Sequence, residues 1–193
     1  MKLVLATHNA HKVEELRRIL GDSLAGIDLV GYDGPEAIED GDTFEANALI
    51  KARAAAAHTG LAALADDSGI CVDALGGAPG IHSARYAGTR EDADNVALLL
   101  KNLAGEPNRA AHFTCAAALV VGDSEFVELG IWNGSILEEA VGAGGFGYDP
   151  IFKPVGLSVS SAELRADEKN AISHRAKAFA AIMPVVRREL LGE

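Results

Sequence analysis

The residues best suited to chemistry are two adjacent acids, Asp66 and Asp67, which are followed by Ser68. They come directly after the apolar run 62–65, which is typical of a short buried strand. A strand of an open α/β sheet delivers such groups to its carboxyl edge, where these sheets bind their ligands. Mg²⁺ takes a few carboxylates together with phosphate oxygens, so the pair could hold a metal against phosphates. An ordinary strand-to-turn junction is the alternative, because Asp, Ser and Gly are frequent there.

A second candidate is the segment Thr7-x-Asn9-x-x-Lys12, which stands between a predicted strand and a predicted helix. Backbone N–H groups at a helix start can face a phosphate chain, together with the hydroxyl, amide and ammonium of these side chains. The segment has neither the glycines nor the spacing of a Walker A loop. The alternative is a helix cap followed by an exposed lysine.

Two later segments offer groups that could meet a nucleobase. The loop 144–149 holds the aromatic ring of Phe146 among glycines, which would make a stacking platform or, alternatively, a hydrophobic plug beneath a loop. Lys169, His174 and Arg175 stand near the start of the predicted last helix. Their side chains are hydrogen-bond donors that could reach carbonyl or phosphate oxygens, although a solvated helix face would have the same composition.

Composition restricts the class of protein. The chain has 193 residues with 49% hydrophobic and 23% charged residues, which is typical of one globular domain, here residues 1–193. A formal net charge of −11 disfavours binding to nucleic acid, and no apolar run is long enough to span a membrane. Cys71 and Cys115 lie in apolar runs, and no signal-peptide pattern is present, so we expect a cytoplasmic protein. The histidines lack zinc-ligand spacing, which disfavours a zinc hydrolase.

Alternating strands and helices would position the candidate groups. Strands are predicted over 2–6 and 27–32, and a helix over 44–58 that is capped by Thr43 precedes the strand carrying the acids. A helix over 91–103 and a hairpin of 113–121 with 125–132 follow, then a further strand at 135–137. The closing helix is predicted over 168–191, with Pro184 as a candidate kink. This order predicts a mixed α/β sheet with two lobes and a central active-site cleft.

Taken together, these motifs closely resemble those of the inosine triphosphate pyrophosphatase family. The resemblance covers the whole chain. It rests on Ala6-Thr7-x-Asn9-x-x-Lys12, Ala65-Asp66-Asp67-Ser68-Gly69, Leu75-Gly76-Gly77-Ala78-Pro79-Gly80, Ser83-Ala84-Arg85-Tyr86, Gly144-Gly145-Phe146-Gly147-Tyr148-Asp149-Pro150 and Ser173-His174-Arg175. It implies a homodimer and a Mg²⁺-dependent hydrolase that converts ITP, dITP or XTP into the monophosphate and pyrophosphate and so cleanses the nucleotide pool.

The resemblance also implies roles for single residues. Asp67 would be a metal ligand and the general base, and Ser68 would contact phosphate. The triphosphate would be held by Thr7, His8, Asn9, Ala10, His11 and Lys12. The nucleoside and the remaining phosphate contacts would involve Phe146, Gly147, Tyr148, Asp149, Lys169, His174 and Arg175. Asp66 would support Asp67, or could itself orient the attacking water.

The second metal ligand is less directly indicated. Members of the family carry a glutamate in the loop before the long helix, and that loop is rich in acids here. Aligned on Gly41, the acid falls at Glu39 or Asp40, or Ile38 occupies its position; we predict Glu39. Two other functions stay open at this point: a related pyrophosphatase acting on modified pyrimidine nucleotides, and a nucleotide-binding module without catalysis.

Overall fold

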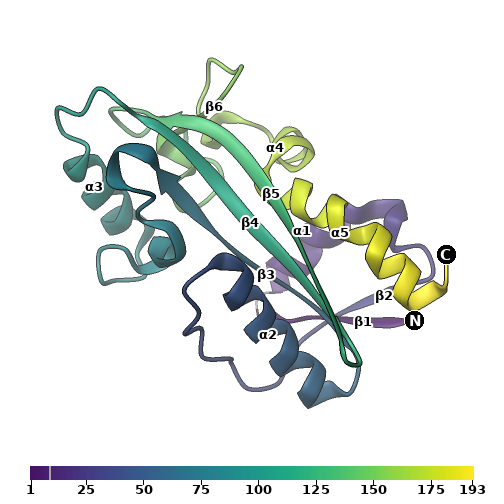
Figure 1. Ribbon diagram of the computed structural model, residues 1–193. Helices are drawn as coiled ribbons and strands as arrows, with labels where there is room; N and C mark the ends of the chain where they lie inside the picture. Colours follow the sequence, from purple (N-terminus) through teal and green to yellow (C-terminus); the bar gives the residue numbers. More distant parts are fainter. Residues whose placement is uncertain (9) are drawn as a thin grey trace. The chain divides into compact units, whose positions relative to one another are not determined.

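The computed structural model describes residues 1–8 and 10–193, and the side chains of all of these except residues 10–12 (Figure 1). The strands are β1 (Lys2–Leu5), β2 (Asp28–Gly31), β3 (Ala62–Val72), β4 (Ala110–Val121), β5 (Ser124–Ile136) and β6 (Phe152–Pro154). The helices are α1 (Ala10–Leu20), α2 (Phe44–Thr59), α3 (Asp92–Asn102), α4 (Ala166–Ile172) and α5 (His174–Leu191). No helix of the described chain is both long and apolar enough to cross a membrane.

Within the described residues, the strands form one six-stranded sheet in the order β2-β1-β3-β4-β5-β6. β1 runs parallel to both β2 and β3, and its Leu3–Leu5 segment pairs with Ala62–Leu64. β5 and β6 are antiparallel. β4 and β5 are joined by only two residues, Gly122 and Asp123, a link short enough to connect antiparallel strands alone. The prediction of a mixed α/β sheet is therefore confirmed.

The chain divides into two compact units. Unit 1 comprises Met1–Asp67, Cys115–Gly130 and Arg175–Glu193, and unit 2 comprises Ser68–Thr114 and Ile131–His174. Strands β3, β4 and β5 each contribute residues to both. The assignment of residues 1–193 to a single domain stays a prediction.

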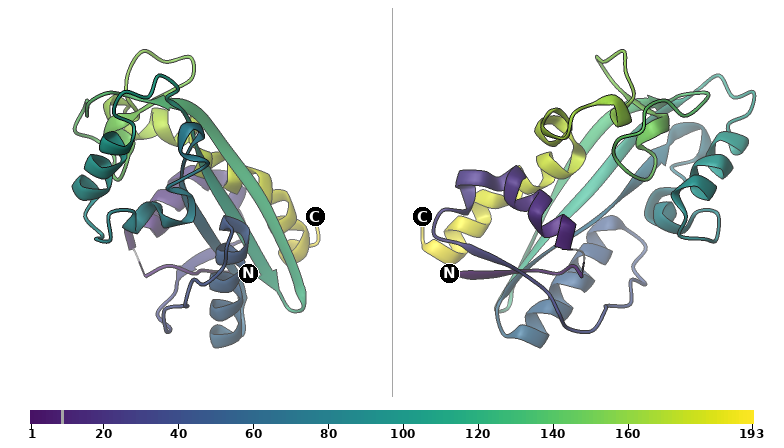
Figure 2. Two further views of the ribbon diagram at one scale, coloured as in Figure 1. Left: turned by 60° about the vertical axis from the view of Figure 1, so that its left-hand side comes forward. Right: turned by 180° about the vertical axis from the view of Figure 1, so that it is seen from behind.

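Unit 1 has an apolar core on each face of its strands, because successive side chains of a strand point to opposite faces. Leu3, Leu5 and Leu64 pack with α1 and α5, which lie side by side (Figure 2). Val4 and Ala63, which alternate with those leucines, pack with Ala55 of α2. As predicted, α2 begins at Thr43, which accepts a hydrogen bond from Ala46 N at 3.1 Å. The helix ends at Gly60, whose φ of 67° favours glycine.

Unit 2 has its own core of aromatic and aliphatic side chains. Phe113 of β4 packs edge-on against Phe152 of β6, with 4.7 Å between ring centres, and Trp132 of β5 lies beside both. Leu99 and Leu103, at the end of α3, are fully buried against this cluster. Tyr148 and Ile151, from the segment between β5 and β6, belong to the same core.

The acidic stretch does not end a strand, contrary to prediction. β3 continues through it as one 11-residue strand, Ala62–Val72. β1 pairs with β3 only as far as Leu64, and β4 is the neighbour of β3 on its other side. Asp66 and Asp67 therefore lie within β3, just beyond the end of β1.

Two further predictions were wrong at the carboxyl-terminal half. The strand expected at 135–137 is the end of β5. The single closing helix is two helices, because Ser173 adopts an extended conformation, φ −66° and ψ 160°, between α4 and α5. Neither glycine nor proline marks this break. His174 begins α5 with its ring stacked on Phe113 at 4.7 Å, so tertiary packing rather than local sequence holds the junction. Pro184 lies inside α5.

Candidate functional site

On the α2 face of unit 1, one ammonium group joins two acids. Lys51 Nζ donates to Asp67 Oδ1 at 3.0 Å and to Glu39 Oε2 at 3.1 Å. The Lys51 and Asp67 side chains are only 17% and 14% exposed, so water screens this contact weakly. Of the acids in the loop before α2, Glu39 is thus the one that shares a cation with Asp67.

The loop that carries Glu39 is fixed by α2. Asn47, one turn before Lys51, accepts a hydrogen bond from Gly41 N at 2.9 Å through its side-chain oxygen. Residues four apart lie on one face of a helix, so Asn47 and Lys51 together present a polar face to the loop. A Cβ at Gly41 would lie 2.8 Å from that oxygen, which explains glycine at this position.

The charges at this cluster shift its protonation equilibria. Burial raises the pKa of Asp67, Glu39 raises it further, and although Lys51 and Asn47 lower it, the pKa stands above the usual range of aspartate. Burial lowers the pKa of Lys51, but Asp67, Asp66 and Glu39 outweigh burial and raise it overall. A carboxylate with an upward-shifted pKa is a better proton acceptor near neutral pH than an ordinary one.

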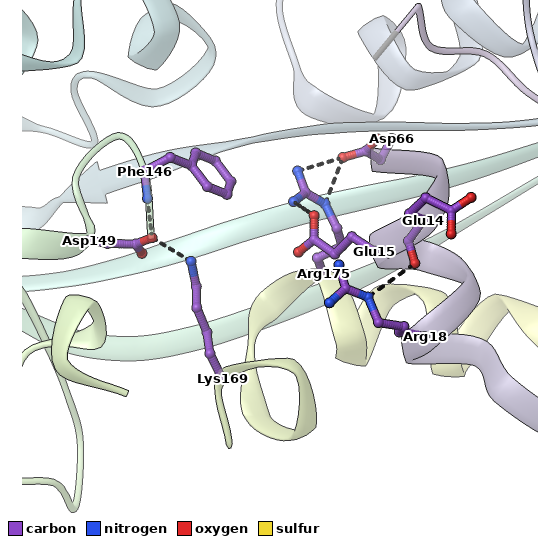
Figure 3. A network of polar contacts seen from close by, with 8 residues as sticks. All are labelled: Glu14, Glu15, Arg18, Asp66, Phe146, Asp149, Lys169 and Arg175. Atoms are coloured by element: carbon purple, nitrogen blue, oxygen red, sulfur yellow. Dashed lines mark hydrogen bonds and ion pairs between the residues drawn. The ribbon is translucent and has the colours of Figure 1, made fainter. Parts of the chain in front are cut away.

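Asp66 faces the opposite side of β3, toward α5 (Figure 3). Arg175 donates to Asp66 Oδ2 from Nε at 3.2 Å and from Nη2 at 3.1 Å, and its Nη1 lies 3.4 Å from Glu15 of α1. Both partners of the Asp66–Arg175 pair are less than 10% exposed. Burial lowers the pKa of Arg175, but Asp66, Cys115 and Glu15 raise it overall, so the guanidinium stays charged. Its role as a donor to a nucleotide stays a prediction.

In unit 2, the carboxylate of Asp149 organises the glycine-rich loop (Figure 3). It accepts hydrogen bonds from Phe146 N at 2.9 Å and from Ser161 Oγ at 2.6 Å, and it forms an ion pair with Lys169 of α4. Gly147 N donates to Asp92 Oδ2 at the start of α3, at 2.6 Å. Asp149 is itself 2% exposed, so in this structure it shapes the loop from inside.

The two aromatic residues of this loop have different positions. Tyr148 is buried and donates from its hydroxyl to Ser83 O at 2.8 Å, and burial raises its pKa. Phe146 is 57% exposed, and Lys169 Nζ lies 4.7 Å from its ring centre. Tyr148 is therefore the plug beneath the loop, while Phe146 presents a ring with a cation beside it.

The remaining predicted residues differ in their exposure to solvent. Thr7 and Ser68 are half-buried and His8 is exposed, with a ring nitrogen 2.6 Å from Gly34 O. His174 is 8% exposed under its stack on Phe113. The predictions for Asn9 and for the side chains of Ala10, His11 and Lys12 lie outside the described residues.

Sequence reasoning did not identify several residues that build these clusters: Glu15, Asn47, Lys51, Asp92 and Ser161. Asn47 and Lys51 had a usable signal, because two polar residues four apart interrupt an alanine-rich helix directly after an acidic loop. Glu15, Asp92 and Ser161 had none, because each contacts a residue distant in the chain.

Comparison with known proteins gives consistent matches over the whole chain. Residues 3–185 match a family model described as the Ham1 family. A dITP/XTP pyrophosphatase of Leifsonia xyli subsp. xyli is 61% identical over 97% of this chain and 96% of its own length, and one of Streptomyces coelicolor is 54% identical over 99% of each. The solved structure of a HAM1 protein from Coxiella burnetii, 40% identical, has a TM-score of 0.90 and covers 97% of this chain and 99% of that one.

Proposed function

The chain belongs to the Ham1 family, and we propose that it hydrolyses noncanonical purine nucleoside triphosphates, ITP, dITP and XTP, to the monophosphate and pyrophosphate. The resemblance read from the motifs is confirmed by this membership. Curated relatives named dITP/XTP pyrophosphatase match over nearly their full length, which supports the proposed activity. Within the chain, the proposal rests on one observation: Asp67 and Glu39 both form ion pairs with the ammonium of Lys51.

The two acids fit a divalent metal of the Mg²⁺ type. The ammonium of Lys51 already sits within 3.1 Å of an oxygen from each, so the protein tolerates a cation there. All the donors are carboxylate oxygens, which Mg²⁺ prefers, and it commonly takes only one or two carboxylates together with substrate phosphates. Among the described residues, no group of three or more His, Cys, Asp or Glu side chains is placed to hold a metal. We propose Asp67 and Glu39 as the ligands.

When bound, the metal would neutralise charge on the phosphates during in-line displacement. Asp67 would accept the proton of the water that attacks the α-phosphorus. Asp66 would hold the backbone of β3 in place through its ion pair with Arg175. The hydroxyl of Ser68 and the segment from Thr7 to Lys12 would donate to phosphate oxygens.

The nucleoside would be bound by residues of unit 2. Phe146 offers an exposed ring on which a purine can stack, and the ammonium of Lys169 offers a donor beside that ring.

Hypoxanthine and xanthine carry a 6-oxo acceptor, whereas adenine carries an amino donor at that position. A donor-rich pocket would leave adenine's amino group facing another donor, at a cost of about 1–3 kcal/mol. This supports a preference for ITP over ATP.

Three finer features of the proposal follow the family resemblance: dependence on Mg²⁺, assembly into a homodimer and a cytoplasmic location. The acidic net charge of −11 agrees with a small-molecule substrate rather than nucleic acid. Sedimentation at several protein concentrations would test the dimer.

A substrate panel tests the activity. ITP, dITP, XTP, GTP, ATP and dUTP would each be incubated with and without Mg²⁺, and phosphate and pyrophosphate would be measured separately. We expect pyrophosphate release from ITP, dITP and XTP only with Mg²⁺. Release from dUTP alone would instead favour an enzyme for pyrimidine nucleotides, and the Asp67→Asn variant controls for contaminating phosphatases.

A further inference from the structure

Lys51 donates hydrogen bonds to both of the carboxylates proposed as metal ligands. The lysine comes from the third turn of α2, Glu39 from the loop before it and Asp67 from β3, so the ammonium joins three separate segments of unit 1. Among the described residues, no other lysine or arginine bonds to either acid. We propose that Lys51 is an internal counter-ion that competes with the metal and keeps the metal site closed until a nucleotide arrives.

The competition follows from charge and space. A divalent cation that takes oxygens of Glu39 and Asp67 would stand within a few ångströms of the ammonium, and two cations so close repel each other strongly in a poorly screened site. Lys51 is 17% exposed and Asp67 14%, so little water is available to screen that repulsion. The metal can bind only after the ammonium has moved.

A bound nucleotide would draw the Lys51 ammonium away from the two acids. Its phosphates carry negative charge, so they offer Lys51 a new anionic partner while they complete the coordination of the metal. Metal and nucleotide would then bind with strong mutual reinforcement, and the metal alone would bind weakly. This inference rests on the proposed function, since it takes the ligand set from there.

The test measures metal binding without nucleotide and without turnover. Mn²⁺, as a probe for Mg²⁺, would be titrated into the full chain by electron paramagnetic resonance and by calorimetry. Removing the charge in Lys51→Met should tighten Mn²⁺ binding about tenfold, in line with the change of about one pKa unit or more that a neighbouring charge causes in proton binding by a carboxylate. Lys101→Met is the matched control: it removes one lysine charge from an exposed position in the last turn of α3 and should leave Mn²⁺ affinity within twofold of wild type.

Binding of Mn²⁺ in the presence of a nucleotide gives a second readout. With a non-hydrolysable ITP analogue present, the wild type should bind Mn²⁺ at least tenfold more tightly than without it, and Lys51→Met should show a smaller gain. Unchanged or weaker Mn²⁺ binding by Lys51→Met alone would overturn the inference. If Lys51→Met unfolds, Lys51→Gln keeps a polar side chain without the charge and should show the same tightening.

The two proposals fail in different ways. If the wild type releases pyrophosphate from ITP but Lys51→Met binds Mn²⁺ no better, the function stands and the role of Lys51 is wrong. If Mn²⁺ does not bind under any condition while pyrophosphate is still released, the ligand set itself is wrong.

Discussion

Asp66 and Asp67 are neighbours in the chain, yet each forms an ion pair with a different cation on a different side of β3. Asp66 meets Arg175 of α5 at 3.1 Å, and Asp67 meets Lys51 of α2 at 3.0 Å. The strand conformation is the cause, because it turns successive side chains to opposite faces. The two acids therefore cannot act as one paired group, and they are expected to respond differently to the same substitution.

Asp67→Asn should reduce turnover of ITP about 100-fold or more, because it removes the proposed proton acceptor. Nucleotide binding should change much less. Steady-state kinetics and equilibrium binding of a non-hydrolysable ITP analogue would separate the two. Activity close to that of the wild type would exclude Asp67 as the base.

Asp66→Asn should chiefly reduce stability. It leaves the guanidinium of Arg175, which is 6% exposed, with only the longer 3.4 Å contact to Glu15. Removing one partner of a buried ion pair costs about 3–5 kcal/mol. Urea denaturation would measure the loss. As a control, Glu14→Gln removes an exposed carboxylate that pairs with Arg17 on the surface of α1, and it should change stability by less than about 1 kcal/mol.

The pKa of Asp67 in the metal-free protein should respond oppositely to its two partners. Lys51 lowers this pKa and Glu39 raises it, so Lys51→Met should raise it further and Glu39→Gln should lower it. Carbon-13 NMR titration of the Asp67 carboxyl measures the shift directly, and shifts of equal sign would contradict the arrangement.

Phe146→Ala should raise the KM for ITP about tenfold, since stacking of a base on an aromatic ring contributes about 1–3 kcal/mol. Stability should hardly change, because the ring is 57% exposed. Tyr148→Phe, two residues on, should do the reverse: it leaves Ser83 O without its buried donor and should cost about 1 kcal/mol of stability or more. Kinetics and thermal denaturation of both variants, measured side by side, would test whether Phe146 contributes to substrate binding and Tyr148 to stability.

Gly145→Ala should disrupt the loop that holds Phe146. Gly145 has φ of 70°, and a Cβ there would clash with the Asp149 carboxylate, which receives the hydrogen bond from Phe146 N. The variant should raise KM as Phe146→Ala does. Gly147→Ala is the matched comparison, because Gly147 also has positive φ but no atom within 4 Å of its Cβ. An equal effect of both would mean that backbone strain, rather than contact with Asp149, is responsible.

The local sequence determined several of the secondary-structure elements and indicated the family. The apolar runs and their period predicted β1, β2, α2 and the β4–β5 hairpin, because burial patterns and caps are set by residues near one another. The motifs around Asp67 and Phe146 indicated the family, which the comparisons confirm. Tertiary structure alone decided the partners of those motifs. The ion pairs of Asp66 and Asp67, the break at Ser173 and the exposure of Phe146 depend on residues up to 109 positions apart, and side chains so distant are brought together only by folding.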